Sequence, residues 1–145
     1  EEYESTLRKR GLIDFDDMML LGLRLIEQHD WVRQVLQARF PILVVDEYQD
    51  LGVPLHRLVL SLCFPSEGPA TRLFAVGDPD QSIYGFTGAE PELLRNLSKR
   101  VDVGSVTLRL NYRSRQHIIS ASEIVLQEER GYRSVNSDAG LIDFH

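Results

Sequence analysis

Two short apolar runs without polar alternation stand out in the hydrophobic pattern of this 145-residue chain. They are Ile42 to Val45 and Leu73 to Val76. Such runs are typical of strands buried on both faces of a parallel sheet. A third strand is expected over residues 103–110, and another begins at about 141. Because helical stretches alternate with these strands, the pattern predicts an α/β fold with a parallel sheet.

Helices are predicted from apolar residues at helical spacing and from residues that favour helix ends. A charged helix over residues 2–10 ends at Gly11. Asp14 can cap a second helix, and Met18, Leu21 and Leu25 are expected to form its buried face. The further helices expected are one from Asp30 that Pro41 ends, one from Pro54 to Cys63, one from Glu90 to Leu97, and one capped by Ser114 that reaches about Glu128.

Polar clusters follow three of the predicted strands. Asp46 and Glu47 follow the first, residues 78–81 the second and residues 111–113 the third. The carboxyl ends of parallel strands form the edge where ligands bind, so three clusters suggest one ligand edge, with the first two in one sheet. Adjacent carboxylates on opposite sides of a strand allow one to hold Mg²⁺ and the other to act as a base in phosphoryl transfer. The alternative is a polar turn in which Asp50 caps the next helix.

Composition narrows the classes of protein that remain. The formal net charge of −6 argues against a generally basic nucleic-acid surface, so any polynucleotide contact must be local or use basic residues from elsewhere. The single Cys63 lies in an apolar run and predicts a buried thiol, which fits a reducing cytoplasm. Met18 to Leu23, the longest uncharged apolar run, is too short to span a bilayer.

The clusters also resemble the motifs of a known family. Asp46 to Asp50 resembles the Walker B element of the UvrD/Rep/PcrA family of superfamily 1 DNA helicases. Val76 to Phe86 is similar to that family's third motif and Leu110 to Ser114 to its fourth, while Ile13 to Asp17 is also typical of the group. The resemblance runs from about Tyr3 to Leu126, with the motifs in order.

This resemblance implies a division of the chain into three parts. Residues 1–33 would be the end of an inserted helical subdomain with its return helix. Residues 34–106 would form the C-terminal part of a first RecA-like (P-loop NTPase) motor domain, and residues 107–145 the beginning of a second.

The resemblance assigns phosphate chemistry to three residues of the first two clusters. It implies that Asp46 holds Mg²⁺, that Glu47 activates the attacking water and that Gln81 senses the γ-phosphate of ATP. An amide suits such a sensor because it can both donate and accept hydrogen bonds. The alternative for Gln81 is a turn amide bonded to nearby backbone.

Four further residues receive roles in the same way. The resemblance implies that Tyr112 stacks on adenine and that Arg113 reaches the γ-phosphate from the second motor domain. It implies that Tyr84 and Phe86 stack on single-stranded bases. The alternatives are that Tyr84, Phe86 and Tyr112 are packed core aromatics and that Arg113 is a solvated surface residue.

The activity implied is that of an ATP-dependent DNA helicase or translocase. It would couple ATP hydrolysis, with Mg²⁺, to 3′-to-5′ movement on single-stranded DNA, and would bind single-strand/double-strand junctions but no membrane. The chain opens without Met, and its only lysines, Lys9 and Lys99, do not stand in a Gly-Lys-Ser/Thr sequence. We therefore expect a fragment that lacks the phosphate-binding loop and does not hydrolyse ATP alone.

Two other functions fit part of the pattern. A degenerate motor module would bind DNA or a partner protein without turnover, although the intact Asp46, Glu47, Gln81 and Arg113 count against it. A metal-dependent nuclease or phosphatase would also use carboxylates at strand ends, but would not need Gln81, Tyr112 and Arg113 at these spacings.

The chain departs from the family pattern at three places. Leu51-Gly52 stands where the family usually has Thr-Asn, His56 is near a usual Gln, and Thr87 replaces a frequent Arg. Thr87 removes a charged contact to DNA, so we expect weaker or differently arranged strand binding there. None of these residues belongs to the expected phosphate chemistry.

Overall fold

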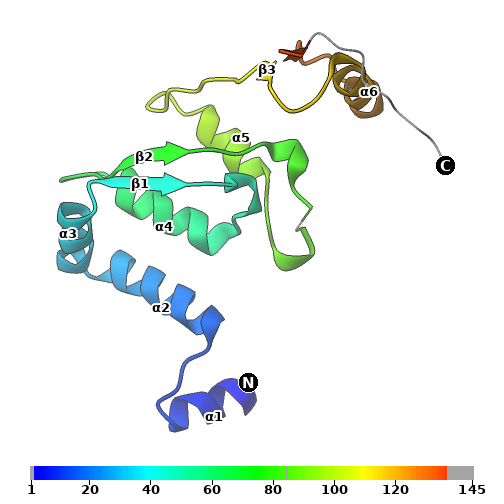
Figure 1. Ribbon diagram of the computed structural model, residues 1–145. Helices are drawn as coiled ribbons and strands as arrows, with labels where there is room; N and C mark the ends of the chain where they lie inside the picture. The colour runs from blue at the N-terminus through cyan, green and yellow to red at the C-terminus, as the bar shows by residue number, and fades with distance from the viewer. Residues whose placement is uncertain (1, 84, 137–145) are drawn as a thin grey trace. The chain divides into compact units, whose positions relative to one another are not determined.

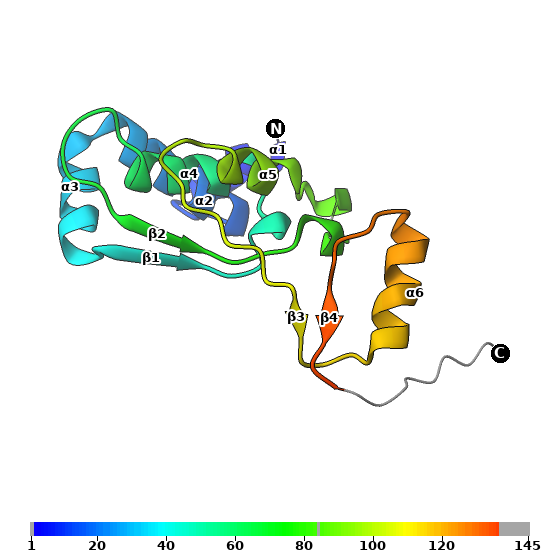
Figure 2. The same cartoon turned by 90° about the horizontal axis from the view of Figure 1, so that it is seen from above.

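The computed structural model describes residues 2–83 and 85–136. The chain divides into two compact units, Glu1–Val103 and Gly104–His145. Among the described residues, the first unit contains several helices and one small parallel sheet, and the second contains one helix and one small parallel sheet, as Figures 1 and 2 show. The predicted mixed α/β class with parallel strands is therefore confirmed for the described residues.

The first unit holds most of the regular structure. Its elements are α1 (Glu2–Lys9), α2 (Phe15–Gln28), α3 (Asp30–Arg39), β1 (Ile42–Val45), η1 (Tyr48–Asp50), α4 (Val53–Cys63), β2 (Arg72–Ala75), η2 (Pro79–Gln81), η3 (Gly85–Thr87) and α5 (Glu92–Ser98). The second unit contains β3 (Leu110–Asn111), α6 (Gln116–Leu126) and β4 (Arg133–Ser134). No helix among the described residues has the length and apolar character needed to cross a membrane.

The start of α2 follows the sequence prediction, but its buried face does not. Asp14 is the N-cap, and its Oδ1 accepts a hydrogen bond of 2.8 Å from the Asp17 N–H. The expected buried residues are exposed: Met18 by 47%, Leu21 by 39% and Leu25 by 50%. The helix instead buries Leu23 and Ile26, three positions apart on one stripe, and it packs mainly on α4.

The two strands of the first sheet are covered on one face only. β1 pairs with β2 in parallel, with Leu43 opposite Leu73 and Val45 opposite Ala75. These four side chains pack against a buried cluster of Tyr48, Val59, Cys63 and Leu97, and α4 lies on that face in Figures 1 and 2.

The opposite face of this sheet corrects the expectation that both strands are buried on both faces. Ile42 is 52% exposed, Val44 65% and Phe74 61%. The strands alternate between exposed and half-buried residues because the helices of the first unit cover only the α4 side. The apolar runs therefore predicted strands correctly and their two-sided burial wrongly.

A hydrogen bond from tyrosine to histidine lies beside this core. Tyr48 is fully buried, and its hydroxyl lies 2.8 Å from His56 Nδ1, with the two rings edge to face. Burial, with a smaller contribution from Cys63, raises the pKa of Tyr48 to about 12, so the phenol stays protonated and can donate to Nδ1 of a neutral imidazole. Burial also lowers the pKa of His56, and the Arg100 charge lowers it further against a small opposing effect of Glu90.

The predicted burial of the single thiol is confirmed. Cys63 is free and 6% exposed at the end of α4. Burial raises its pKa to about 11. The thiolate is therefore disfavoured, and Cys63 acts as an apolar core residue.

The second unit has less regular structure than the sequence predicts. A strand was expected over residues 103–110, but only Leu110 of that range lies in β3. The strand is this short because β4 pairs with it over only two residues. Arg115, not Ser114, is the N-cap residue of α6, and it forms no side-chain cap hydrogen bond. The carbonyl of Ser114 instead accepts a 2.8 Å hydrogen bond from Ser134 Oγ in β4. The strand expected from about residue 141 lies outside the described residues.

His56 makes the stability of the first unit depend on pH. The pKa of His56 in the folded protein lies below its ordinary value of 6.5, so the unfolded chain takes up the proton first as the pH falls. The free energy of unfolding should therefore be greatest above 6.5 and decrease as the pH falls from 6.5 towards the lower folded pKa. Urea unfolding measured between about pH 7.5 and about pH 5 covers this range.

Replacing His56 by Gln keeps a side chain that can accept from Tyr48 and removes the titration. The His56→Gln variant should lose stability less steeply than the parent over this range. His29→Gln, at an exposed position between α2 and α3, is the matched control, and the pH dependence that comes from His56 should remain in it because the Tyr48–His56 hydrogen bond is intact. Equal slopes in the parent and in His56→Gln would contradict this assignment.

Candidate functional site

The ends of β1 and β2 bring the first two polar clusters together. The N–H of Val76 donates to the carbonyl of Val45 at 2.9 Å, and the N–H of Tyr48 donates to the carbonyl of Val76, also at 2.9 Å. These bonds continue the parallel pairing past the last residues of the strands. The Asp46-Glu47 turn and the loop over 77–81 therefore lie side by side, as predicted for the first two clusters.

The turn after β1 contains a strained backbone at Glu47. Its φ of 50° and ψ of 47° place it in the left-handed region, which is uncommon for a residue with a Cβ. Asp46 Oδ1 accepts the Glu47 N–H at 3.0 Å, and both residues are exposed. Left-handed backbone costs roughly 1–2 kcal/mol, and strain of this kind is concentrated at functional sites.

The alternative reading of this turn, with Asp50 as a helix cap, is wrong. The N-cap of α4 is Gly52, and it has no side-chain cap hydrogen bond. Oδ1 of Asp50 is buried and has no hydrogen-bond partner among the described residues. The acidic turn is therefore not explained by helix capping.

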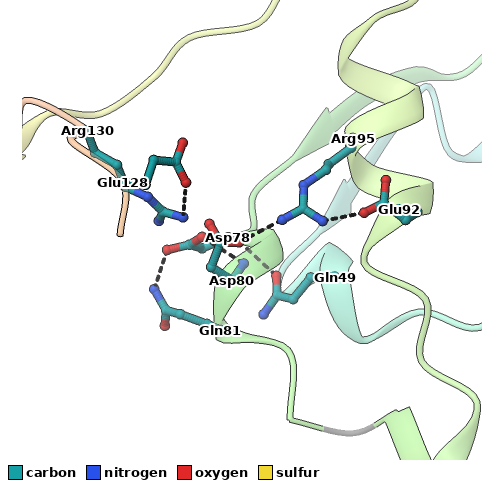
Figure 3. Close-up of polar contacts among 8 residues, drawn as sticks. All are labelled: Gln49, Asp78, Asp80, Gln81, Glu92, Arg95, Glu128 and Arg130. Carbon is teal, nitrogen blue, oxygen red and sulfur yellow. Dashed lines mark hydrogen bonds and ion pairs between the residues drawn. The ribbon is translucent and has the colours of Figure 1, made fainter. Parts of the chain in front are cut away.

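Gln49 joins the two strand ends. It is only 2% exposed, and Figure 3 shows its amide directed towards the loop after β2. Its Nε2 donates to Glu47 Oε2 at 2.8 Å, and its Oε1 accepts the Asp78 N–H at 3.0 Å. The sequence patterns gave Gln49 no role, because only the fold shows that it lies between the two clusters.

The loop after β2 is held by the carboxylate of Asp78. One oxygen accepts the Asp80 N–H at 3.1 Å, and the other accepts Gln81 Nε2 at 2.8 Å. The Gln81 side chain is exposed, and its amide donates to a carboxylate. The alternative for Gln81 expected a bond to nearby backbone instead. Arg95 of α5 pairs with Asp80 at 2.7 Å and also with Glu92, as Figure 3 shows.

The aromatic loop, the segment over residues 85–90 that carries Phe86, ends close to the residues that follow the acidic turn. The N–H of Glu90 donates to the carbonyl of Leu51 at 3.1 Å. A Cβ on Gly52 would lie 2.9 Å from the carbonyl oxygen of Gly88, so glycine permits this approach of two backbones. Phe86 in η3 is 84% exposed and is not a core residue of the first unit. Tyr84 lies outside the described residues.

The third cluster belongs to the second unit. Asn111 Oδ1 accepts the N–H groups of Arg113 at 2.9 Å and Ser114 at 2.7 Å, which fixes the turn after β3. Tyr112 is 74% exposed and Arg113 is also exposed. Tyr112 therefore does not pack in the core of its unit, and both side chains are accessible from solvent.

The carboxylates of the first unit suit a metal ion that is shared with a ligand. Among residues 2–83 and 85–136, no three His, Cys, Asp or Glu side chains form a cluster that could hold a metal ion by themselves. Mg²⁺ in nucleotide sites is commonly held by one or two carboxylates together with phosphate oxygens. Asp46, an exposed carboxylate at the end of β1, fits that kind of shared site.

Comparison with known proteins agrees with the motifs at this edge. A family model described as the UvrD/REP helicase N-terminal domain matches residues 1–102. The chain belongs to the UvrD/Rep helicase family. The matched range contains both strand-end clusters of the first unit.

Individual members of the UvrD/Rep family match over most of the chain. The chain is 41% identical over 135 residues to ATP-dependent DNA helicase UvrD2 of Mycobacterium tuberculosis, covering 90% of this chain and 19% of that protein. It is 38% identical over 125 residues to ATP-dependent DNA helicase Rep of Escherichia coli, covering 86% and 18%. It is 34% identical over 146 residues to UvrD1 of Mycobacterium tuberculosis, covering 97% and 19%. The chain thus spans about a fifth of the length of these curated relatives.

Gly52 allows a direct test of the contact between the acidic turn and the aromatic loop. In Gly52→Ala, the new Cβ meets a backbone oxygen, so the loop or the start of α4 must shift. We expect a loss of about 1–3 kcal/mol in the free energy of unfolding, as for other overpacked positions. Urea unfolding measures this change.

Gly22→Ala in α2 is the matched control. A Cβ at Gly22 meets nothing within 4 Å, so alanine in this helix should stabilise the protein by about 0.5–1 kcal/mol. A Gly52→Ala variant as stable as the parent would show that the two backbones do not lie this close.

Proposed function

We propose that the chain carries part of the ATPase site of an ATP-dependent DNA helicase or translocase, built on RecA-like motor domains and moving 3′ to 5′ on single-stranded DNA. The main support is the side-by-side placement of the Asp46-Glu47 turn and the Asp78–Gln81 loop at the carboxyl ends of two parallel strands. Ligands of open α/β sheets bind at this edge. The names of the relatives, which are ATP-dependent DNA helicases, support the same proposal.

The proposed roles divide the chemistry among the residues of this edge. Asp46 holds Mg²⁺, which when bound would neutralise charge on the phosphate oxygens. Glu47 takes the proton of the attacking water, and Gln81 contacts the γ-phosphate once its amide leaves Asp78. From the second unit, Tyr112 stacks on adenine and Arg113 stabilises charge on the γ-phosphate.

The proposed DNA contact uses aromatic side chains. Phe86 is 84% exposed, and stacking of a base on such a ring contributes about 1–3 kcal/mol. Tyr84 is proposed for the same role from the sequence alone. Thr87 carries no charge, so the contact at this loop relies on stacking more than on phosphate pairing. The substrates proposed are single-stranded DNA and single-strand/double-strand junctions.

The domain division stays as predicted from the resemblance. Residues 1–33 are assigned to the end of a helical subdomain, 34–106 to a first RecA-like domain and 107–145 to a second. The observed units divide between Val103 and Gly104, close to the second of these boundaries. A cytoplasmic location is proposed from the single buried thiol.

A motor module that binds DNA or protein without turnover is the alternative. For these 145 residues by themselves it is supported by the lack of any Gly-Lys-Ser/Thr sequence. The chain alone is expected not to hydrolyse ATP in either case, so the two functions are separated in the complete gene product that contains the chain.

The proposed base is tested by Glu47→Gln in that complete gene product. The amide cannot accept the proton of water, so kcat for ATP should fall by about 10²-fold or more. Binding of ATP and Mg²⁺ should be largely unchanged, because Asp46 is intact. Steady-state ATPase assays and titration calorimetry measure the two effects. Turnover at the parent's rate would exclude Glu47 as the base, and the lack of turnover in the parent itself would favour the binding module.

The stacking role is tested by Phe86→Ala. The variant should bind single-stranded DNA more weakly by about 1–3 kcal/mol, with little change in thermal stability, because the ring is exposed. Phe15→Ala is the matched control: Phe15 is 85% exposed on α2, and its loss should leave DNA affinity unchanged. Fluorescence anisotropy with labelled oligonucleotides measures the DNA affinity, and a thermal melt measures the stability. Unchanged DNA affinity, or a large drop in melting temperature, would refute the stacking role.

A further inference from the structure

The Gln49 amide forms a hydrogen bond at each of its two ends, one to the turn after β1 and one to the loop after β2. The Glu47 carboxylate can only accept and the Asp78 N–H can only donate, so the amide can lie in one orientation alone. Nε2 faces Glu47 at 2.8 Å and Oε1 faces Asp78 at 3.0 Å. An apolar side chain of this size could form neither bond, and a glutamate could form only the bond to Asp78.

The space around this amide is closed by glycine. A Cβ on Gly77 would lie 2.5 Å from Gln49 Oε1, 2.9 Å from Leu94 Cδ2 and 3.0 Å from the Tyr48 nitrogen. Gly77 does not have a positive φ, so its smallness and not its conformational freedom is what the site requires. Gly77 therefore lies against the Oε1 end of the Gln49 amide, and only 2% of Gln49 is exposed.

The hydrogen bonds form a continuous chain through four side chains and one backbone group. Glu47 contacts Gln49, Gln49 contacts the N–H of Asp78, and the Asp78 carboxylate contacts Gln81. Figure 3 shows the part from Gln49 to Gln81. The bond to Gln49 also restrains Glu47, whose backbone is in the strained left-handed region.

We infer that Gln49 is a positioning residue that keeps the Glu47 carboxylate and the Asp78–Gln81 loop in a fixed arrangement. This inference rests on the proposed function, in which Glu47 takes a proton from water and Gln81 contacts the γ-phosphate. Gln49 touches neither the water nor the nucleotide in this assignment. It acts through Glu47 and through the backbone of Asp78.

The first test measures geometry without nucleotide, by hydrogen exchange of backbone amides in the complete gene product. The Asp78 N–H should exchange slowly in the parent and quickly in Gln49→Met, which has no oxygen to accept it. Gln49→Glu, which has the same size, should keep the protection because its carboxylate still accepts. Gln37→Met is the control: Gln37 is also buried, but donates to the carbonyl of Leu62, so its loss should leave Asp78 protected.

The second test measures ATP turnover. Gln49→Met and Gln49→Glu should each lower kcat by about 10–100-fold, as loss of a supporting contact typically does, with KM for ATP unchanged. In a Glu47→Gln background, Gln49→Glu should cause little further loss, because this variant keeps the bond to Asp78 and its effect therefore passes through Glu47. A merely structural role would lower the rate by the same factor in both backgrounds.

The outcomes separate this inference from the proposed function. If Glu47→Gln keeps full turnover, the proposed base is wrong, whatever the exchange of Asp78 shows. If Glu47→Gln is inactive while Gln49→Met and Gln49→Glu keep the parent's kcat, the positioning role alone is overturned. Equal exchange of the Asp78 N–H in the parent and in Gln49→Met would also overturn it.

Discussion

The parallel pairing of β1 with β2 is the interaction on which the site depends. Its register places Val45 opposite Ala75, and two further backbone hydrogen bonds reach beyond the strands to Tyr48 and Val76. The segments that follow β1 and β2 therefore leave the sheet at the same edge and in the same direction. A shift of one residue in this register would turn the side chains of one strand to the other face, which would expose Leu43 and Val45 and separate the two polar clusters.

The exposed acidic turn is supported by buried neighbours. Tyr48 and Gln49 follow Glu47 directly, and they are 0% and 2% exposed. Tyr48 anchors the turn in the apolar cluster below the sheet and is bonded to His56 of α4. Gln49 connects the turn to the loop after β2. These contacts account for how a left-handed Glu47 persists, since strain at one residue is retained only where its surroundings determine the conformation.

Local signals in the sequence predicted most elements of the first unit well, and long-range packing limited the rest. The Asp14 cap and the strands after Pro41 and Thr71 depend on nearby residues, so short patterns were sufficient. The buried stripe of α2 depends on where α4 lies, and for that reason Leu23 and Ile26 could not be chosen over Met18 and Leu25. The exposure of Ile42, Val44 and Phe74 likewise depends on which layers cover the sheet.

The candidate site shows the same division. The pairing of the first two clusters could be predicted, because parallel strands end at a common edge. The role of Gln49 could not, because a glutamine after a carboxylate turn has no distinctive pattern, and only the fold brings it to Asp78 and Gly77. Tyr112 and Arg113 were given roles only through the resemblance of their motif, and the structure shows that both are exposed residues of the second unit.

The most direct measurement is a structure of the complete gene product with Mg²⁺, ADP and aluminium fluoride, which imitates the γ-phosphate during transfer. The account predicts that the nucleotide binds at the carboxyl ends of β1 and β2, with Asp46 on the Mg²⁺, directly or through one water. It also predicts that Glu47 contacts the attacking water. The Gln81 amide should contact the fluoride and no longer donate to Asp78. Nucleotide and metal bound away from this edge, with Asp46 and Glu47 unchanged, would contradict it.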